Sequence, residues 1–319
     1  MLYILINEQV LIFFPLLIIS INERNDFMGF FNKNENNNGY TDLSGMRNNR
    51  NYSSPQYYDQ NYNQNYNQNY DQNYGQYGYP QESVPFNPQA YNGAYESGIS
   101  LSDFTRNVYL RMFIGLIITF GIGIIAVFNP EMVINLIGDN IGIFLIICGI
   151  EVILVFTLGF FIQKMSPAAA TAIFYTYSIV NGITIAPLLV LYDMGTVFWT
   201  LAVTAGIFGL MSFVGFITKI DLSKLGPILL FGLIGLIIFS IIAMFFAIPM
   251  SDLIICIIGI ILFMGFTMYD TKKIKAFYNA SAGDPDRQKK STIIAALQLY
   301  LDFVNLFLYI LRLFARNRN

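Results

Sequence analysis

The chain has 319 residues, of which 55% are apolar and 12% are charged, and its mean hydropathy is +0.52. Soluble globular proteins carry about 25% charged residues, so this composition predicts an integral membrane protein. The net charge of −2 and the pI near 5.2 provide no basic excess to attract nucleic acid, which excludes that class of partner. The chain has no histidine, so any proton switch near neutral pH has to use buried carboxyl groups.

Residues 1–27 form an apolar leader whose role the sequence leaves open. Leu2 to Ile21 are mostly apolar, but Glu8 interrupts them and no Lys or Arg precedes Arg24. A signal peptide needs a positive amino-terminal region and a small-residue cleavage site, and neither is present. The remaining interpretations are an eighth span and a true start of translation at Met28, and we favour the later start.

Residues 28–103 form a low-complexity tail of Asn, Gln, Tyr, Gly, Ser and Pro. A four-residue repeat runs from Gln60 to Gly75, and it is too polar to bury a core. We therefore expect this tail to be disordered. Its composition is typical of segments that self-associate, and the alternative is a solvated tail without specific partners.

Residues 104–319 contain seven apolar runs that are long enough to cross roughly 30 Å of hydrocarbon. The runs are Val108 to Phe128, Ile141 to Ile162, Ala168 to Tyr192, Val197 to Ile217, Ile228 to Phe246, Leu253 to Met268 and Ile293 to Phe314. The sequence therefore predicts an all-α membrane domain, a seven-transmembrane helical bundle.

Local signals agree with these runs. Asn129-Pro130 ends the first run, and Ser166-Pro167 and Gly226-Pro227 begin the third and the fifth. Four small residues spaced three apart in the fourth run predict close helix packing in lipid. These residues are Gly206, Gly209, Ser212 and Gly215.

Positive charges predict the orientation, because Lys and Arg collect in cytoplasmic loops. Alternate connections contain them, as Arg106, Arg111, Lys164, Lys219, Lys224, Lys272, Lys273, Lys275, Arg287, Lys289 and Lys290. This pattern predicts a cytoplasmic amino terminus and six spans. The seventh run breaks the pattern because Arg312, Arg316 and Arg318 end it, so it is either a re-entrant helix or a full span enclosed by the other six.

A polar stripe runs along the seventh segment. Gln298, Asp302, Asn305, Tyr309 and Arg312 recur at helical spacing and share one face. That face has to meet protein or water, not lipid. Asp302 lies in the middle of the apolar run, where an acid is a functional-site hypothesis by default.

Asp270, at the inner end of the sixth run, is the expected partner of Asp302. Two carboxyl groups close together in a low dielectric do not both ionise easily, so the pair would share a proton and act as a pH sensor and gate. The alternative treats Asp270 as an interface residue beside Lys272 and Lys273, and Asp302 as a packing residue hydrogen-bonded to Asn305 or to a backbone carbonyl.

Glu151, in the second run, is the third acid at membrane depth. We group it with Gln298, Asn305 and Arg312 as a supporting polar pathway. Acids at this depth suit cations, and oxygen ligands match hard ions such as Ca²⁺ or protons, so Asp270 and Asp302 are also candidate Ca²⁺ contacts. We expect no cofactor.

Three strings resemble the bacterial branch of the Bax inhibitor-1 family. They are Lys164-Met-Ser-Pro-Ala, Tyr269-Asp-Thr and Ala296-Leu-Gln-Leu-Tyr-Leu-Asp-Phe-Val-Asn-Leu-Phe-Leu-Tyr-Ile-Leu-Arg. The resemblance covers about residues 104–314. It implies a seven-helix fold with a central last helix, a pH-gated cation leak and a sensor formed by Asp270 and Asp302.

The resemblance also implies an acid in span two, matched by Glu151, and a basic residue near the inner end of that span. The corresponding stretch here is Gly159-Phe-Phe-Ile-Gln, which has no base. A base that pairs with the sensor would therefore have to be Lys164 or Arg111.

The main hypothesis is a pH-sensitive Ca²⁺ leak channel of the bacterial cytoplasmic membrane, with the lipid bilayer, Ca²⁺ and protons as its partners. The alternative is a non-enzymatic membrane protein that regulates stress responses or a membrane protease, a role that the family resemblance also implies. An intramembrane aspartyl protease needs Gly-x-Gly-Asp, whereas the chain has Leu299-Tyr-Leu-Asp302. We expect no enzymatic activity.

Overall fold

The computed structural model describes residues 99–133, 141–219, 225–246 and 251–316. Within these ranges the chain is helical and contains no strand. Seven of the helices are long and apolar enough to cross a membrane, which confirms the predicted all-α bundle. The apolar leader and nearly all of the predicted tail lie outside the described residues.

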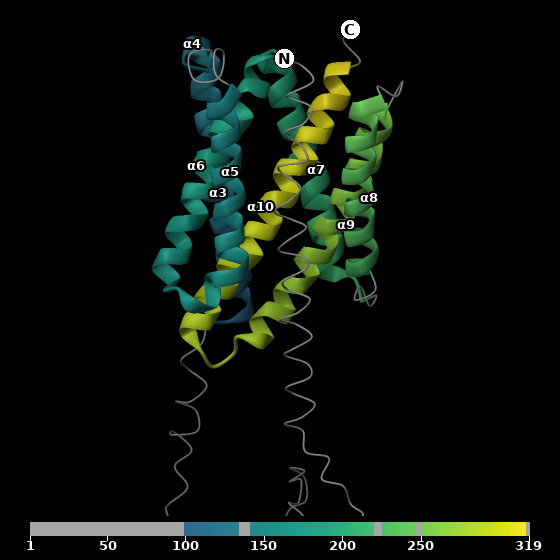
Figure 1. Ribbon diagram of the computed structural model, residues 1–319. Helices are drawn as coiled ribbons and strands as arrows, with labels where there is room; N and C mark the ends of the chain where they lie inside the picture. The colour runs from purple at the N-terminus through teal and green to yellow at the C-terminus, as the bar shows by residue number, and fades with distance from the viewer. Residues whose placement is uncertain (1–98, 134–140, 220–224, 247–250, 317–319) are drawn as a thin grey trace, which may run out of the picture.

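The helices follow the predicted order with extended ends (Figure 1). They are α3 (Leu101–Phe128), α4 (Pro130–Val133), α5 (Ile141–Phe161), the 3₁₀ turn η2 (Ile162–Lys164), α6 (Pro167–Val190), α7 (Met194–Ile217), α8 (Leu225–Phe246), α9 (Ser251–Ala280) and α10 (Pro285–Arg316). The largest differences are in α9 and α10, which extend well beyond their apolar runs toward the connection that joins them.

Side-chain caps fix several helix starts. The Ser166 hydroxyl accepts a hydrogen bond from the Ala169 N–H, as predicted for Ser166-Pro167. Asp193 caps α7 in the same way, accepting from the Thr196 N–H at 2.7 Å. Each cap satisfies a backbone donor that the first helical turn leaves unpaired.

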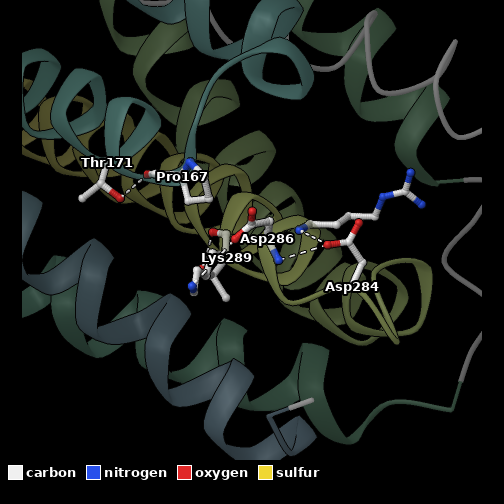
Figure 2. A network of polar contacts seen from close by, with 7 residues as sticks. Pro167, Thr171, Asp284, Asp286 and Lys289 are labelled. Atoms are coloured by element: carbon white, nitrogen blue, oxygen red, sulfur yellow. Dashed lines mark hydrogen bonds and ion pairs between the residues drawn. The ribbon is translucent and has the colours of Figure 1, made fainter. Parts of the chain in front are cut away.

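Asp284 caps the start of α10 (Figure 2). Its Oδ1 accepts from the backbone N–H groups of Arg287 and Asp286, both at 3.0 Å, and Pro285 occupies the first helical position. These backbone hydrogen bonds, with that from Arg287 the stronger, lower the pKa of the exposed Asp284 carboxyl group. Gly283 turns the chain into this cap with φ of 83°, a conformation that favours glycine.

The last helix is the centre of the bundle. Residues 292–311 of α10 are all buried, and α10 packs against α3, α6, α7 and α9. On one side α3, α5 and α6 form the first half-bundle, and on the other side α7, α8 and α9 form the second half-bundle. The yellow helix in Figure 1 runs between them. This arrangement confirms the central last helix that the family resemblance implied.

The helix α10 spans the whole bundle. Its first turns lie beside η2, where the Lys290 Nζ donates to the Gln163 carbonyl at 3.1 Å. Near its other end, Arg312 is within electrostatic range of Tyr192, which follows α6. This course along the full length of the bundle favours a full span over the re-entrant alternative for the seventh segment. We call the end of the bundle that contains η2 and the α9 to α10 connection the basic end.

The small residues of α7 do not form one packing face. Gly215 contacts the backbone of Met268 in α9, and Ser212 is buried, but Gly206 and Gly209 are exposed with open space around them. Each three-residue step falls about 60° short of a full turn, so the four positions spread over about 180°. The prediction was right for the last two residues and wrong for the first two.

Candidate functional site

Asp302 is fully buried in the middle of α10. Among the residues that the structure describes, neither of its carboxyl oxygens has a hydrogen-bond partner, and the same holds for Oε1 of Gln298 one turn earlier. Native proteins pair nearly all buried polar atoms. An unsatisfied carboxyl group at the centre of a bundle is therefore a feature that needs an explanation.

Asp270 faces Asp302 from α9. It is 5% exposed, and its carboxyl group interacts electrostatically with that of Asp302. The structure thus brings together the two aspartates that the sequence singled out. No direct hydrogen bond from Asp302 joins them, so the pair interacts through charge.

Lys273 is the base at this site. Its Nζ lies 4.0 Å from Oδ1 of Asp270, and it also acts electrostatically on Asp302. The rings of Tyr269 and Phe277 lie 5.4 and 5.3 Å from the ammonium group, and the Lys273 side chain is 16% exposed. One ammonium group therefore faces two carboxyl groups at the interface of α9 and α10.

The expected bases contact other groups. Arg111 donates to the Thr171 hydroxyl at 3.1 Å, and Lys164 lies over the ring of Phe161. From the sequence, Lys273 enters only as a neighbour of Asp270 in the alternative interpretation of that residue. The spacing of three residues within one helix was the signal that could have identified the pair.

A hydroxyl chain lies next to Asp270. Thr271, which is 1% exposed, shares a 3.3 Å contact with the Tyr109 hydroxyl and donates to the Ser212 hydroxyl at 3.3 Å. These contacts join α3, α9 and α7 one residue beyond the aspartate. They hold the backbone of α9 in place where the carboxyl groups meet.

The rest of the α10 stripe also faces protein. Asn305 donates from Nδ2 to the Leu301 carbonyl of its own helix at 2.7 Å. The Tyr309 ring packs on Phe263, with centroids 5.9 Å apart, and leaves no room for a side chain at Gly259. The stripe from Gln298 to Tyr309 is therefore buried, and at Tyr309 it faces α9.

Arg312 lies where α10 emerges from the core. Its side chain is half-buried, and it is close to Tyr192 and Tyr309. Burial raises the pKa of Tyr192, and the positive charge of Arg312 opposes that effect. Arg312 is thus placed toward the end of the bundle opposite the basic end.

Glu151 does not join the aspartates. It is 3% exposed on α5, and its Oε1 accepts a hydrogen bond from the Asn181 amide on α6. This contact belongs to the first half-bundle, whereas Asp270 belongs to the second. The predicted supporting pathway is therefore divided between two sides of α10.

Asp270 and Asp302, the candidate Ca²⁺ contacts, supply two carboxyl groups. In the part of the chain that the structure describes, no group of three or more His, Cys, Asp and Glu side chains could hold a metal ion. Ca²⁺ prefers six to eight oxygen ligands, more than Asp270 and Asp302 supply. The pair suits a brief contact with a passing cation better than a stable complex.

Comparison with known proteins identifies relatives of this chain. A profile of the family described as "Inhibitor of apoptosis-promoting Bax1" matches residues 101–319. Inner membrane protein YbhL of Escherichia coli K12 is 36% identical over 220 residues, which is 68% of this chain and 93% of YbhL. The profile match covers all the helices described above.

Two further relatives show the same extent of similarity. An uncharacterized protein of Borreliella burgdorferi is 35% identical over 216 residues, 68% of this chain and 93% of its own length. Protein RP147 of Rickettsia prowazekii is 32% identical over 229 residues, 72% of this chain and 94% of its own length. These alignments cover nearly the whole length of each relative.

Proposed function

The chain belongs to the Bax inhibitor-1 family of membrane proteins, and on that premise we propose that it is a pH-sensitive cation leak channel. Asp270 and Asp302 form its proton-controlled closure, and Ca²⁺ is the cation that we expect it to conduct. The observation that carries this proposal is the fully buried Asp302 carboxyl group, which has no hydrogen-bond partner among the described residues and faces a second carboxyl group.

Charge balance supports a proton in the closed state. With one proton on the pair, one carboxylate remains and Lys273 neutralises it, so the site is neutral overall. Loss of that proton leaves one uncompensated negative charge at mid-membrane, which costs several kcal/mol. The charge is stabilised if water or a cation enters between α9 and α10, and that entry opens the path.

The chemistry of the site favours cations, which it would bind with low affinity. Acidic groups at membrane depth select against anions, and conduction requires that an ion leave as readily as it binds. Two carboxyl groups without further clustered ligands meet that requirement. A leak is therefore a better match than a storage or transport site that holds its ion.

We place the protein in the inner membrane of a bacterium. It has seven helices of spanning length, and its relative YbhL is named an inner membrane protein. Lys and Arg are concentrated at the basic end, and positive charge favours the cytoplasmic side. The start of α3 would then be cytoplasmic. We further propose that the protein acts without enzymatic chemistry.

The test is Ca²⁺ flux through purified full-length protein in liposomes over a series of pH values. We expect wild-type flux to rise as pH rises through the titration of the pair. Asp302→Asn keeps the shape of a protonated carboxyl group but cannot ionise, so its flux should stay low and independent of pH. Thr157→Val, which alters a hydroxyl bonded within α5, serves as a matched control.

Two results would contradict the proposal. If Asp302→Asn retained the pH profile of the wild type, the aspartate pair would not be the sensor. If the wild-type protein conducted no Ca²⁺ at any pH, the leak itself would be ruled out, leaving the protease-regulating alternative.

A further inference from the structure

A second buried polar network lies on the opposite side of α10 from Asp270. Asn181 donates from Nδ2 to Oε1 of Glu151, and the Tyr300 hydroxyl donates to Oδ1 of Asn181 at 2.9 Å. Thr119 lies 2.6 Å from the Tyr300 hydroxyl and donates to the Ser178 carbonyl at 2.8 Å. All five residues are buried, and they join α5, α6, α10 and α3.

When Glu151 is ionised, this network has fewer hydroxyl hydrogens than oxygen–oxygen contacts that need one. The two hydroxyl groups of Tyr300 and Thr119 supply two hydrogens. They make three contacts with oxygen atoms, namely those from Tyr300 to Asn181, between Tyr300 and Thr119, and from Thr119 to Ser178. One oxygen pair is therefore left without a hydrogen between its atoms, and inside a protein such a defect is costly.

One added proton and one amide rotation remove the defect. The oxygen and nitrogen of an Asn amide occupy nearly equivalent positions, so the direction of Asn181 is decided by its hydrogen-bond partners. If Glu151 donates to Oδ1 of Asn181, the Asn181 Nδ2 donates to Tyr300, Tyr300 donates to Thr119, and Thr119 donates to the Ser178 carbonyl. Each of these four contacts then has one hydrogen between its two polar atoms.

We propose that Glu151 is a second proton-binding site of this protein, whose carboxyl proton completes a hydrogen-bond chain directed from α5 through α6 and α10 to α3. The ligand of this site is a proton. The site is independent of the aspartate pair, because Tyr300 and Asp302 are two residues apart and lie about 160° from each other around the axis of α10. It goes beyond the proposed leak and does not require it.

The state of Glu151 determines whether α10 is bonded to α3. When Glu151 loses its proton, the Asn181 amide turns its Nδ2 toward the carboxylate and presents its oxygen to Tyr300. Tyr300 has a single hydroxyl hydrogen and gives it to that oxygen. The contact between Tyr300 and Thr119 then has no hydrogen, so ionisation on α5 breaks a bond between α10 and α3.

The surroundings of Glu151 are neutral. The groups that act on it are Asn181, Thr184 and Tyr177 of α6, together with Tyr300 of α10. Lys164, in the η2 turn that follows α5, lies over the Phe161 ring. None of these groups carries a positive charge, and an uncompensated carboxylate buried among them costs more free energy than the neutral acid.

The direct test is infrared spectroscopy of the wild-type protein in lipid at neutral pH. Cell-free synthesis with glutamate labelled by ¹³C at the carboxyl group distinguishes Glu151 from the aspartates, and Glu131, the other glutamate in the described part of the chain, is exposed. We expect a protonated carboxyl band that shifts with labelled glutamate and is lost in Glu151→Gln. A spectrum with no glutamate-dependent band would overturn the proposal.

Stability is a second readout. Glu151→Gln should unfold at nearly the wild-type temperature, since the Gln amide can donate to Asn181 as the protonated acid does. Asn181→Leu breaks the chain in the middle and should lower the unfolding temperature clearly, while Thr157→Val on the same helix as Glu151 should not. If Glu151→Gln destabilised the protein as much as Asn181→Leu, the site would require a negative charge and the proposal would fail.

Both readouts are independent of transport. A protein that conducts no Ca²⁺ but shows the glutamate band would disprove the leak and retain the second proton site. A protein that conducts Ca²⁺ but lacks that band would retain the leak and disprove the second proton site. If Glu151→Gln did not fold, the labelled wild-type protein would still decide the question.

Discussion

At the scale of single residues, the site depends on the balance between two carboxyl groups and one ammonium group. Among the described residues no hydrogen bond holds Asp302 as an ion, whereas the Lys273 Nζ lies 4.0 Å from Oδ1 of Asp270. In the proposed closure, this lysine of the same helix as Asp270 would set how readily the pair gives up its shared proton.

Lys273→Met tests this role. Without the ammonium group both carboxylates become less stable as ions, so the pair should keep its proton to a higher pH. We expect the pH at which Ca²⁺ flux is half-maximal to rise by about one unit, which corresponds to about 1.4 kcal/mol. Lys275→Met, at an exposed position of the same helix, is the control and should leave the midpoint unchanged. A midpoint that moved to lower pH would show that Lys273 does not stabilise the ionised pair.

The residue scale also shows what the sequence could not reveal. Asp302 was identifiable because a charge interrupts an apolar run, and Asp270 because it lies near the end of the run before it. The Glu151 network was not identifiable, because Asn181, Tyr300 and Thr119 lie far apart in the chain and each is ordinary in a membrane helix. Only the packing of four helices brings their polar atoms within 3 Å of one another.

At the scale of helices, close approach and capping decide where the elements end and how they pack. Apolar runs predicted the cores of the spans well, since a spanning helix must be apolar. The apolar runs did not predict the last turns of α9, because the charges of Lys272, Lys273 and Lys275 are typical of a connecting loop. Those residues lie near the basic end, where long lysine side chains extend toward water while the backbone remains helical.

Gly215→Ala tests the contact between α7 and α9. A Cβ atom at Gly215 would collide with the backbone carbonyl of Met268, which cannot move like a flexible side chain. We expect a loss of about 1–3 kcal/mol in unfolding free energy, measured by denaturation in detergent micelles. Gly209→Ala, with open space around it on the same helix, should be neutral or stabilising. Equal losses in both variants would contradict the packing described here.

The cap of α10 predicts a pH dependence of stability. The folded state lowers the pKa of Asp284 below the ordinary value of 3.8, so its ionised form stabilises the protein above that pH. This contribution should disappear as pH falls through the folded pKa. We expect the difference in unfolding temperature between the wild type and Asp284→Ala to shrink in that range. Asp284→Asn retains a capping oxygen without the charge, and a pH-independent difference for Asp284→Ala would refute the assignment.

At the scale of the whole molecule, α10 separates two half-bundles, and the two proton sites that we propose lie on opposite sides of it. Asp302 faces α9 of the second half-bundle, and Tyr300 bonds to α3 and α6 of the first. The strongest direct contact between the halves is that of α3 with α9. In the proposed channel, movement between α9 and α10 would open a path while α10 remains bonded to the first half-bundle.

The full span of α10 predicts the membrane topology. The basic end should be cytoplasmic, and the last turns of α10 should lie on the outer side with the start of α7. Single cysteines introduced at Lys289 and Gly195, in a protein whose two native cysteines are replaced by Ala, report on the two ends. In intact cells, a membrane-impermeant thiol reagent should label the Gly195→Cys protein and not the Lys289→Cys protein. The opposite pattern would reverse the proposed orientation.

The pH profile of Ca²⁺ flux in liposomes, compared between wild-type protein and Asp302→Asn, tests the central claim most directly. The aspartate pair predicts a wild-type flux that rises with pH and an Asp302→Asn flux that remains low at every pH. A variant whose flux follows the wild-type curve would contradict the claim, because the proton that controls the leak would then reside elsewhere.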